Sequence, residues 1–347
     1  MSSLSFPPLR DPAVALRKMR KNRRKKSSFP LLRLPFVALR EIIEKIEPYE
    51  LLQLSRCSKR MHFFVKNYRD KSPVSLDLCG FKDYTDICLL SQKYSGYKVI
   101  FRVNAEGYID CWKTYNKRGI QYRSKKTERL FSCENIIEGT KFLVVFLYDL
   151  FTARVEKVEV KDEKIWMLDI VEERQGGYSY DADVKRIYGY DNYDEKFRHI
   201  LLDLNPRSLT TCYRPSRRFR IESFHKKYEN LAIAEGEWVT VENLCQVDCV
   251  KLMVNNRYFS STEINRYLKH VLSGGAPRLR KFRVKVQRAN KDVIFEGIQE
   301  LLTGSEQDDD EVGNWNRNGK VAGEVGLVLV SVKIEHFEYL LLEVKEA

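Results

Sequence analysis

Between residues 29 and 71, apolar side chains recur at helical spacing in three short, consecutive stretches. Pro35 has no amide N–H to donate, so it suits the first position of the first helix. Pro48 ends this helix and can begin the second, and Ser58 is a suitable N-cap for the third. The pattern therefore predicts three helices. Their apolar positions are Leu39, Ile42, Ile43 and Ile46, then Leu51, Leu52 and Leu54, then Met61, Phe64, Val65 and Tyr68.

Three helices of this length cannot bury all of these side chains among themselves, so part of the apolar surface is available to a partner. Leu34-Pro35, the aliphatic positions of the first helix, Leu51-Leu52-x-Leu54 and the run Ser55–Arg60 resemble an F-box. In that family the motif docks on a small Skp-type linker protein, which attaches it to a cullin–RING ubiquitin ligase. The alternative is a helical subdomain that packs on its own chain.

The resemblance implies which side chains contact the linker. They are Leu34, Pro35, Leu39, Ile42, Ile43, Ile46, Leu51, Leu52 and Leu54. Phe36-Val37 stands where an acidic pair is frequent in the family, which makes the expected docking face more apolar. Met61-His62 stands where a tryptophan often closes the motif.

From residue 72 to about residue 205 the pattern is mostly typical of strands. Four runs of strand length are rich in β-branched or aromatic residues: Tyr97–Val103, Lys141–Leu150, Ala153–Val160 and Lys164–Ile170. The segment Asp149–Thr152 lies between two of these runs and allows a hairpin turn. Gly176–Glu195 is rich in Gly, Tyr and Asp, and we interpret it as a turn-rich excursion, whose tyrosines suit either a partner interface or a twisted hairpin. We expect a strand-rich region over residues 72–205.

Residues 240–286 show the pattern strand, helix, strand. Cys249–Val254 is a short apolar run, and Ser260 offers an N-cap for a helix over Ile264–Leu272 that Gly274-Gly275 stops. A final strand alternates apolar and basic residues over 281–286. Units of this length favour parallel strands with a right-handed crossover, and their spacing of about thirty residues is close to that of leucine-rich-repeat-like units. Val325–Val332 can supply another strand.

This block also carries a family resemblance. The residues concerned are Asn243-Leu244, Asp248-Cys249, Ile264-Asn265-x-x-Leu268-Lys269-His270 and Ser273-Gly274-Gly275-x-Pro277-Arg278-Leu279. They resemble the type-2 F-box-associated domain of a large group of nematode F-box proteins, and the resemblance implies that residues 206–347 select a protein substrate. The expected fold class is α+β or mixed: a three-helix F-box over 29–71, then a mixed α/β body with leucine-rich-repeat-like strand–helix units.

Positive charge is concentrated near the N-terminus. Of the formal net charge of +13, residues 1–28 contribute +8 and residues 29–71 contribute +4, which leaves +1 for the rest of the chain. The high pI therefore does not indicate a nucleic-acid-binding fold. We expect residues 1–28 to be a disordered basic tail, in which Arg17–Lys26 suits a nuclear import signal, a polyanion contact or a solvated tail. A nucleic-acid-binding protein that uses this tail is the alternative function.

Candidate chemistry is sparse. The sequence lacks the common nucleotide-binding, metalloprotease and serine-hydrolase motifs, and its eight cysteines contain no C-x-x-C pair. We therefore expect no enzyme activity, no metal site and no cofactor. No apolar run approaches eighteen residues and no secretory signal is evident, so we expect a cytoplasmic or nuclear protein without a membrane contact.

The last feature is a basic strand face formed by Lys281, Arg283 and Lys285, which alternate with apolar residues. This face can contact an acidic or phosphorylated segment, or it can be an ordinary solvated surface. Taken together, the patterns predict a substrate-recognition adaptor of an SCF-type ubiquitin ligase, with a Skp-type linker and an unknown protein substrate as partners.

Overall fold

The computed structural model describes residues 31–93, 97–117, 120–123, 128–161, 164–175, 180–185, 193–286, 290–298, 320–325, 328–335 and 339–346. The tail predicted for residues 1–28 lies outside this set. The chain divides into two compact units, Met1–Asp70 and Lys71–Ala347. Within the described parts of both units, no helix has the length and apolarity needed to span a lipid bilayer.

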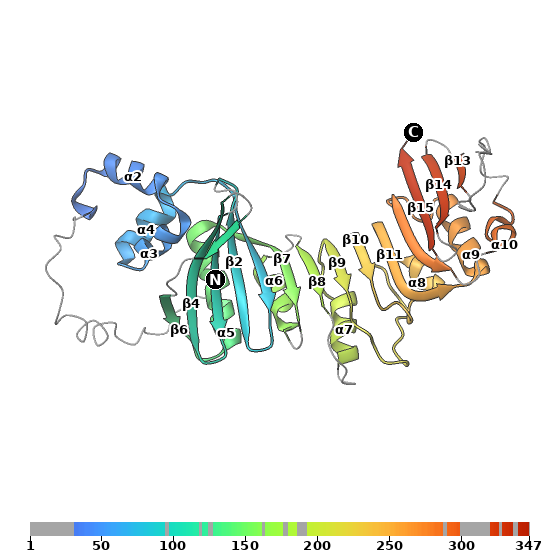
Figure 1. Cartoon of the computed structure of the whole chain (residues 1–347), viewed down its shortest axis with the longest axis horizontal. Helices are drawn as coiled ribbons and strands as arrows, with labels where there is room; N and C mark the ends of the chain where they lie inside the picture. The colour runs from blue at the N-terminus through green and yellow to red at the C-terminus, as the bar shows by residue number, and fades with distance from the viewer. Residues whose placement is uncertain are drawn as a thin grey trace. The chain divides into compact units, whose positions relative to one another are not determined.

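The first unit is helical (Figure 1). Its elements are η1 (Leu31–Arg33), α2 (Phe36–Lys45), α3 (Pro48–Ser55) and α4 (Lys59–Tyr68). Pro35 is the N-cap of α2, Pro48 opens α3, and the Ser58 side chain caps α4 by accepting a hydrogen bond of 3.1 Å from the Met61 N–H. These proline and serine positions explain why the helices begin where they do, and the three predicted helices are confirmed.

The second unit is built on a single sheet. Its strands are β1 (Val74–Gly80), β2 (Tyr84–Ser91), β3 (Tyr97–Asn104), β4 (Tyr108–Lys117), β5 (Ile120–Arg123), β6 (Glu128–Ser132), β7 (Arg154–Val160), β8 (Asp181–Val184), β9 (Ser208–Thr211), β10 (Lys227–Ile233), β11 (Asp248–Phe259), β12 (Lys281–Val286), β13 (Lys320–Val325), β14 (Val328–Glu335) and β15 (Tyr339–Glu346). They lie in the order β13-β14-β15-β12-β11-β10-β9-β8-β7-β1-β2-β3-β4-β5, and β6 also pairs with β4.

The middle of this sheet is parallel and both ends are antiparallel. From β1 through β7 to β12, each strand runs parallel to its neighbours. β2 to β6 continue the sheet antiparallel at one end, and β13 to β15 do so at the other. Since the parallel strands from β7 to β12 follow one another in chain order, this part of the sheet has the sequential arrangement predicted for strand–helix units.

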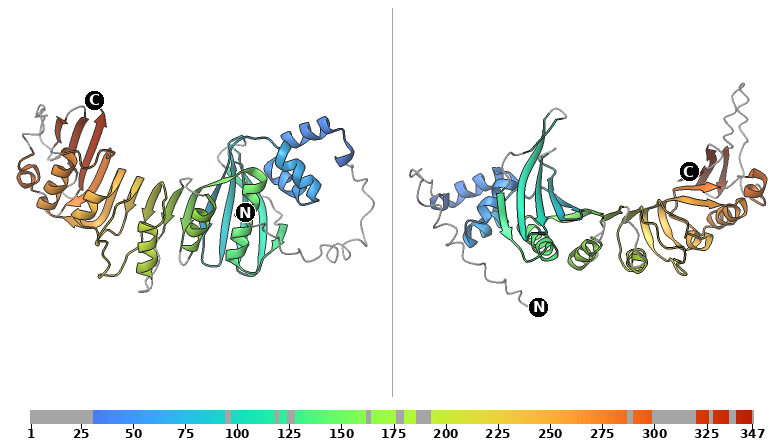
Figure 2. Two further views of the ribbon diagram at one scale, coloured as in Figure 1. Left: turned by 180° about the vertical axis from the view of Figure 1, so that it is seen from behind. Right: turned by 60° about the horizontal axis from the view of Figure 1, so that its bottom comes forward.

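Helices cover one face of the sheet in the second unit. They are α5 (Ile136–Phe151), α6 (Trp166–Gln175), α7 (Tyr193–Leu202), α8 (Val241–Gln246), α9 (Ser261–Leu272) and α10 (Lys291–Phe295). Figure 2 shows α5, α6, α7 and α9 on the same side of the strands. Alternate strand residues are therefore buried beneath them, as Leu78, Val158, Val184, Leu252 and Val284 are, each with 0–2% of its surface exposed. The mixed α/β body predicted from the sequence is confirmed.

Two of the predicted strands are helices instead. Lys141–Leu150 lies within α5, and Lys164–Ile170 runs into α6. The α5 helix begins at Asn135, whose side chain accepts hydrogen bonds of 3.0 Å from two backbone N–H groups of the first turn. Its buried side chains recur at the helical spacing of Leu143, Leu147 and Leu150, so packing on the sheet outweighs the strand propensity of single residues. The predicted hairpin turn at Asp149–Thr152 is the C-terminal end of this helix.

Three other strand predictions agree with the structure, whereas the strand predicted at Val325–Val332 is wrong: it spans the end of β13 and the start of β14, which pair antiparallel. Tyr97–Val103 forms most of β3, and Ala153–Val160 corresponds to β7. The unit β11-α9-β12 is the predicted strand–helix–strand, with parallel strands and buried Phe282, Val284 and Val286. Gly274 ends α9 with a φ of 83°, a conformation that favours glycine. Of the turn-rich excursion Gly176–Glu195, the described part contributes β8 and the first turn of α7.

One histidine bridges neighbouring helices of this unit. His199 of α7 places Nε2 2.9 Å from Oδ1 of Asp169 in α6, and Nδ1 2.6 Å from Oδ2 of Asp203. Partial burial lowers the pKa of His199, but the hydrogen bonds to the two carboxylates outweigh that effect and raise the pKa above its ordinary value of 6.5. The bridge is therefore strongest when the imidazole is protonated.

We expect this bridge to make stability depend on pH. Because the folded-state pKa is raised, the contribution is complete below the unfolded-state pKa of about 6.5 and is lost as the pH rises through the folded-state value. The free energy of unfolding, measured by denaturant titration, should fall more between about pH 6 and about pH 8 for the natural chain than for His199→Gln. His225→Gln, at an exposed histidine, is the matched control. The same pH dependence in both variants would contradict this role of His199.

Candidate protein-interaction surfaces

Several apolar side chains of the helical unit are not buried in its core. Phe36, Val37 and Ile42 on α2 are 50%, 67% and 37% exposed, and Phe63 on α4 is 57% exposed. Large apolar groups exposed together on so small a unit indicate a protein interface. We call these four side chains the apolar docking face.

The nine side chains predicted to contact a linker fall into two groups. Pro35 and Ile42 are exposed, and Leu34, Ile46 and Leu54 are half-buried. The other four lie in the core of the helical unit: Leu39, Ile43, Leu51 and Leu52, with 0–3% of their surface exposed. These four side chains support the docking face from beneath, because they hold the helices together, and they do not form its surface in this structure.

An aromatic cluster fixes the start of α2 against α4. The ring of Phe36 lies edge-on to Tyr68 at 4.9 Å between centroids and 6.3 Å from Phe64. Phe63 contacts Phe64 at 6.1 Å while remaining exposed. Helical spacing placed Phe64 and Tyr68 on one stripe, but it missed the exposure of Phe63. The sequence did contain a signal for this exposure. Phe63 and Phe64 are adjacent in a helix and cannot share one face, so one of them must point away from the core.

The basic strand face lies on β12. Lys281 is exposed, Arg283 and Lys285 are half-buried, and they alternate with buried residues as predicted. Lys251 and Met253 of β11 are the register partners of Lys281 and Arg283, and the Nζ atom of Lys285 lies 5.3 Å from the ring centroid of Tyr258. The face thus extends positive charge across two strands, from Lys251 to Lys281.

The charge of nearby Arg278 is already balanced. Its guanidinium pairs with Glu229 of β10, and its Nη1 lies 3.5 Å from Oδ2 of Asp248 at the start of β11. Arg278 therefore joins neighbouring strands and adds little free charge to the basic strand face. Arg288, also close in sequence, lies outside the described residues.

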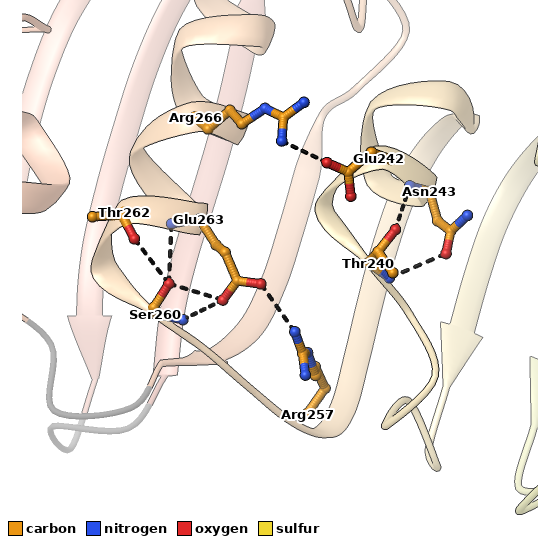
Figure 3. Close-up of polar contacts among 8 residues, drawn as sticks. All are labelled: Thr240, Glu242, Asn243, Arg257, Ser260, Thr262, Glu263 and Arg266. Carbon is orange, nitrogen blue, oxygen red and sulfur yellow. Dashed lines mark hydrogen bonds and ion pairs between the residues drawn. The ribbon is translucent and has the colours of Figure 1, made fainter. Parts of the chain in front are cut away.

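Two capping boxes hold helices that cover the opposite face of the sheet (Figure 3). At α9, Ser260 Oγ accepts a hydrogen bond of 3.2 Å from the Glu263 N–H, and Glu263 Oε2 accepts one of 2.7 Å from the Ser260 N–H. Glu263 also accepts a hydrogen bond of 2.9 Å from Arg257, and the pKa of this carboxyl is lowered: burial opposes the shift, but hydrogen bonds from Ser260 and the charge of Arg257 outweigh it. The start of α9 is thereby tied to the end of β11.

The second box lies at α8. Thr240 and Asn243 exchange hydrogen bonds of 3.1 and 3.2 Å, and the Asn243 side chain, 1% exposed, donates one of 2.8 Å to the Ile221 carbonyl. Arg266 of α9 pairs with Glu242 of α8 at 2.5 Å, and both side chains are more than half exposed. The two helices thus share an ion pair at the surface, while each is capped by its own polar contacts (Figure 3).

Cys79 and Cys88 are half-buried, and Cys249 is buried. Burial raises the pKa of Cys79 to about 11 and the pKa of Cys88 and Cys249 to about 12, so these thiols stay protonated near neutral pH. Among the described residues, no group of His, Cys, Asp and Glu side chains has the arrangement of a metal site.

Comparison with known families matches two parts of the chain. A family model described as an F-box domain matches residues 31–72, and one described as F-box associated matches residues 221–284. No curated protein and no solved structure matches the chain. The chain thus contains an F-box domain, which includes α2, α3 and α4, and an F-box-associated domain, which includes β11 and α9. Such domains point to a substrate adaptor of SCF-type ubiquitin ligases and are typical of proteins without enzyme activity.

The capping boxes generate a stability prediction. Ser260→Ala removes the N-cap of α9 and should lower the free energy of unfolding by about 1 kcal/mol. Arg266→Gln removes only the exposed ion pair with Glu242 and should cost less than about 0.5 kcal/mol. Denaturant titration of both variants measures the difference. Equal losses would show that the cap of α9 is not the stronger of these two contacts.

Proposed function

We propose that this protein is a substrate-recognition adaptor of an SCF-type (cullin–RING) ubiquitin ligase. In this proposal the F-box domain binds a Skp-type linker, and the C-terminal domain binds a protein substrate. The observation that carries it is the combination, in one chain, of an F-box domain with an exposed apolar docking face and a separate F-box-associated domain.

The physical basis of linker binding is burial of the apolar docking face. A fully buried side chain of the size of Ile or Phe contributes about 1.5–3 kcal/mol when it leaves water. Phe36 and Val37 lie in the first turn of α2 and Ile42 lies further along it, so a partner that covers all three must contact more than one side of this helix. The buried leucines and isoleucines beneath keep α2 in place, which reduces the ordering cost of binding.

An adaptor acts by proximity and needs no catalytic group of its own. A substrate held beside the ubiquitin-carrying subunit experiences an effective concentration that is on the order of millimolar for a short flexible connection. The protonated cysteines and the lack of a metal cluster among the described residues are compatible with that role.

Linker binding can be tested with an isolated charge on the docking face. Ile42→Asp should weaken binding to a Skp-type linker by about thirtyfold or more, because about 2 kcal/mol of apolar burial is lost and a carboxylate is desolvated. The measurement is a titration of the linker by calorimetry or biolayer interferometry.

Ser223→Asp is the matched control for this experiment. It adds a carboxylate at an exposed, polar position of the other unit, and it should leave the affinity for the linker within about twofold. Circular dichroism establishes that both variants remain helical. Undiminished linker binding by Ile42→Asp would remove the proposed docking face.

The basic strand face is the proposed contact for an acidic part of the substrate. Replacing Lys281, Arg283 and Lys285 together by Glu should abolish capture of such a substrate, because three like charges then repel it. Linker binding should not change. Substrates captured by the natural and the triple variant chains are compared by mass spectrometry, and an identical set would identify this face as a solvated surface.

A further inference from the structure

A cavity of ≈ 180 Å³ lies at the carboxyl ends of strands β9 and β10. Its lining residues come from two segments: Arg214, Pro215, Ser216, Arg217 and Arg220 follow β9, and Glu235, Glu237 and Trp238 follow β10. The carboxyl ends of parallel strands are where open α/β sheets most often bind their ligands, because the connecting loops converge there. Since the volume of a water molecule in the liquid is about 30 Å³, the cavity has room for a group of several heavy atoms.

Positive charge predominates in the lining. It contains three arginines, Arg214, Arg217 and Arg220, and two acids, Glu235 and Glu237. Arg214 Nη2 pairs with Glu237 at 3.1 Å. The other two arginines have no carboxylate partner among the described residues, and the cavity therefore carries a surplus of positive charge.

The two arginines without a carboxylate differ in their contacts. Arg220 donates hydrogen bonds of 3.0 and 2.7 Å to the carbonyl oxygens of Arg217 and Phe219, which orient its guanidinium without neutralising it. The exposed guanidinium of Arg217 makes no hydrogen bond or ion pair with any described residue. Guanidinium groups bind carboxylates and phosphates through paired N–H donors, so Arg217 is available for a ligand.

A buried donor in the lining also lacks an acceptor. Trp238 is 3% exposed, and its indole Nε1 is buried without a hydrogen-bond partner in the described part of the chain. A buried N–H that loses water without gaining an acceptor is costly, and such groups in folded proteins call for an explanation. Trp238 is therefore a lining residue whose donor the described residues leave unsatisfied.

The frame around the cavity is rigid. Trp238 packs edge-on against Phe219 at 5.3 Å and against Phe197 of α7 at 5.9 Å. Phe219 lies between two arginines of the loop in sequence, and Arg198 of α7 holds the same loop by donating a hydrogen bond of 2.8 Å to the Arg220 carbonyl. These contacts order the arginine loop before a ligand arrives, which lowers the entropic cost of binding.

Two further contacts set the position of the lining segments. Asp194 Oδ1 accepts hydrogen bonds of 3.0 Å from the Ser216 N–H and the Tyr213 hydroxyl, which anchor the arginine loop to α7. Gly236 lets the second segment approach β11, because a Cβ there would lie 2.4 Å from a methyl carbon of Val254. The segment containing Trp238 is thereby held close to the sheet.

We propose that this cavity binds an oxyanion carried by the protein substrate: a phosphate monoester on a side chain, or a carboxylate. The inference rests on the proposed adaptor function and names the substrate chemistry that the C-terminal domain recognises. Arg217 and Arg220 supply the positive charge, and Trp238 supplies a further donor. The site is separate from the basic strand face, because none of its lining residues belongs to β12.

The test measures binding of the full-length chain to three fluorescent peptide libraries. They differ only at one central position, which is phosphoserine, serine or glutamate. Fluorescence polarisation should show binding to the phosphoserine library, to the glutamate library, or to both, at least about tenfold tighter than to the serine library, because charge-assisted hydrogen bonds are added. Whichever anionic library binds identifies the source of the oxyanion. Equal binding to all three libraries would overturn the proposal.

Matched arginine variants separate the cavity from general charge. Arg217→Gln should weaken binding to the preferred anionic library by about tenfold. Arg218→Gln removes the same charge from the next residue, which is exposed and outside the lining, and should change binding by less than about twofold. Equal losses in the two variants, for peptide or for a DNA or RNA oligonucleotide, would indicate non-specific attraction and would contradict the site.

Two other variants complete the experiment. Trp238→Phe keeps an aromatic ring but removes the N–H donor, and it should weaken anionic peptide binding by about threefold or more. Ile42→Asp should leave peptide binding unchanged, since it lies in the other unit of the chain. Linker titration of the Arg217→Gln chain, which should be normal, distinguishes failure of this site from failure of the adaptor function. Peptide binding unaffected by Trp238→Phe would remove the indole from the site.

Discussion

Burial of alternate strand residues beneath helices on one face of the sheet is the constraint on which the larger unit depends. Each parallel strand places side chains such as Val158, Val184 and Val284 under the helices, so the intervening residues must lie on the opposite face. A change of register by one residue would exchange the two sets and expose the core. This constraint orients the basic strand face, and it brings the loops after successive strands together at one edge, where the arginine-lined cavity lies.

The helical unit meets a different constraint, because it is too small to bury all of its apolar surface. Its core uses Ile43, Leu52 and Val65, and the turns of α2 that do not reach this core keep Phe36 and Val37 in water. The same deficit that makes the unit marginal as an isolated fold therefore provides a surface for a partner. In the larger unit, the cavity has more arginines than acids, and the Trp238 N–H beside it lacks an acceptor among the described residues. These features suit a polar ligand.

Local sequence patterns were sufficient to predict where an element begins or which residues alternate in it, because these features depend on residues close together in the chain. Pro48 and Ser58 marked helix starts, Ser260 marked the cap of α9, and the alternation over 281–286 marked β12, all as the structure has them. Propensity failed at Lys141–Leu150, where β-branched and aromatic residues form α5, because burial of a helical face against the sheet contributes more than the preferences of single residues.

The sequence by itself determined the three helices of the first unit, the strand–helix–strand unit that ends with β12 and the two family resemblances, since these depend on spacing along the chain. Only the tertiary structure decided which side chains remain exposed: Leu51 and Leu52 lie in the core, whereas Phe63 faces water. The tertiary structure alone also joined Arg217 to Trp238 in one cavity. The reason is that these two residues follow different strands, and only the parallel pairing of β9 with β10 brings their loops together.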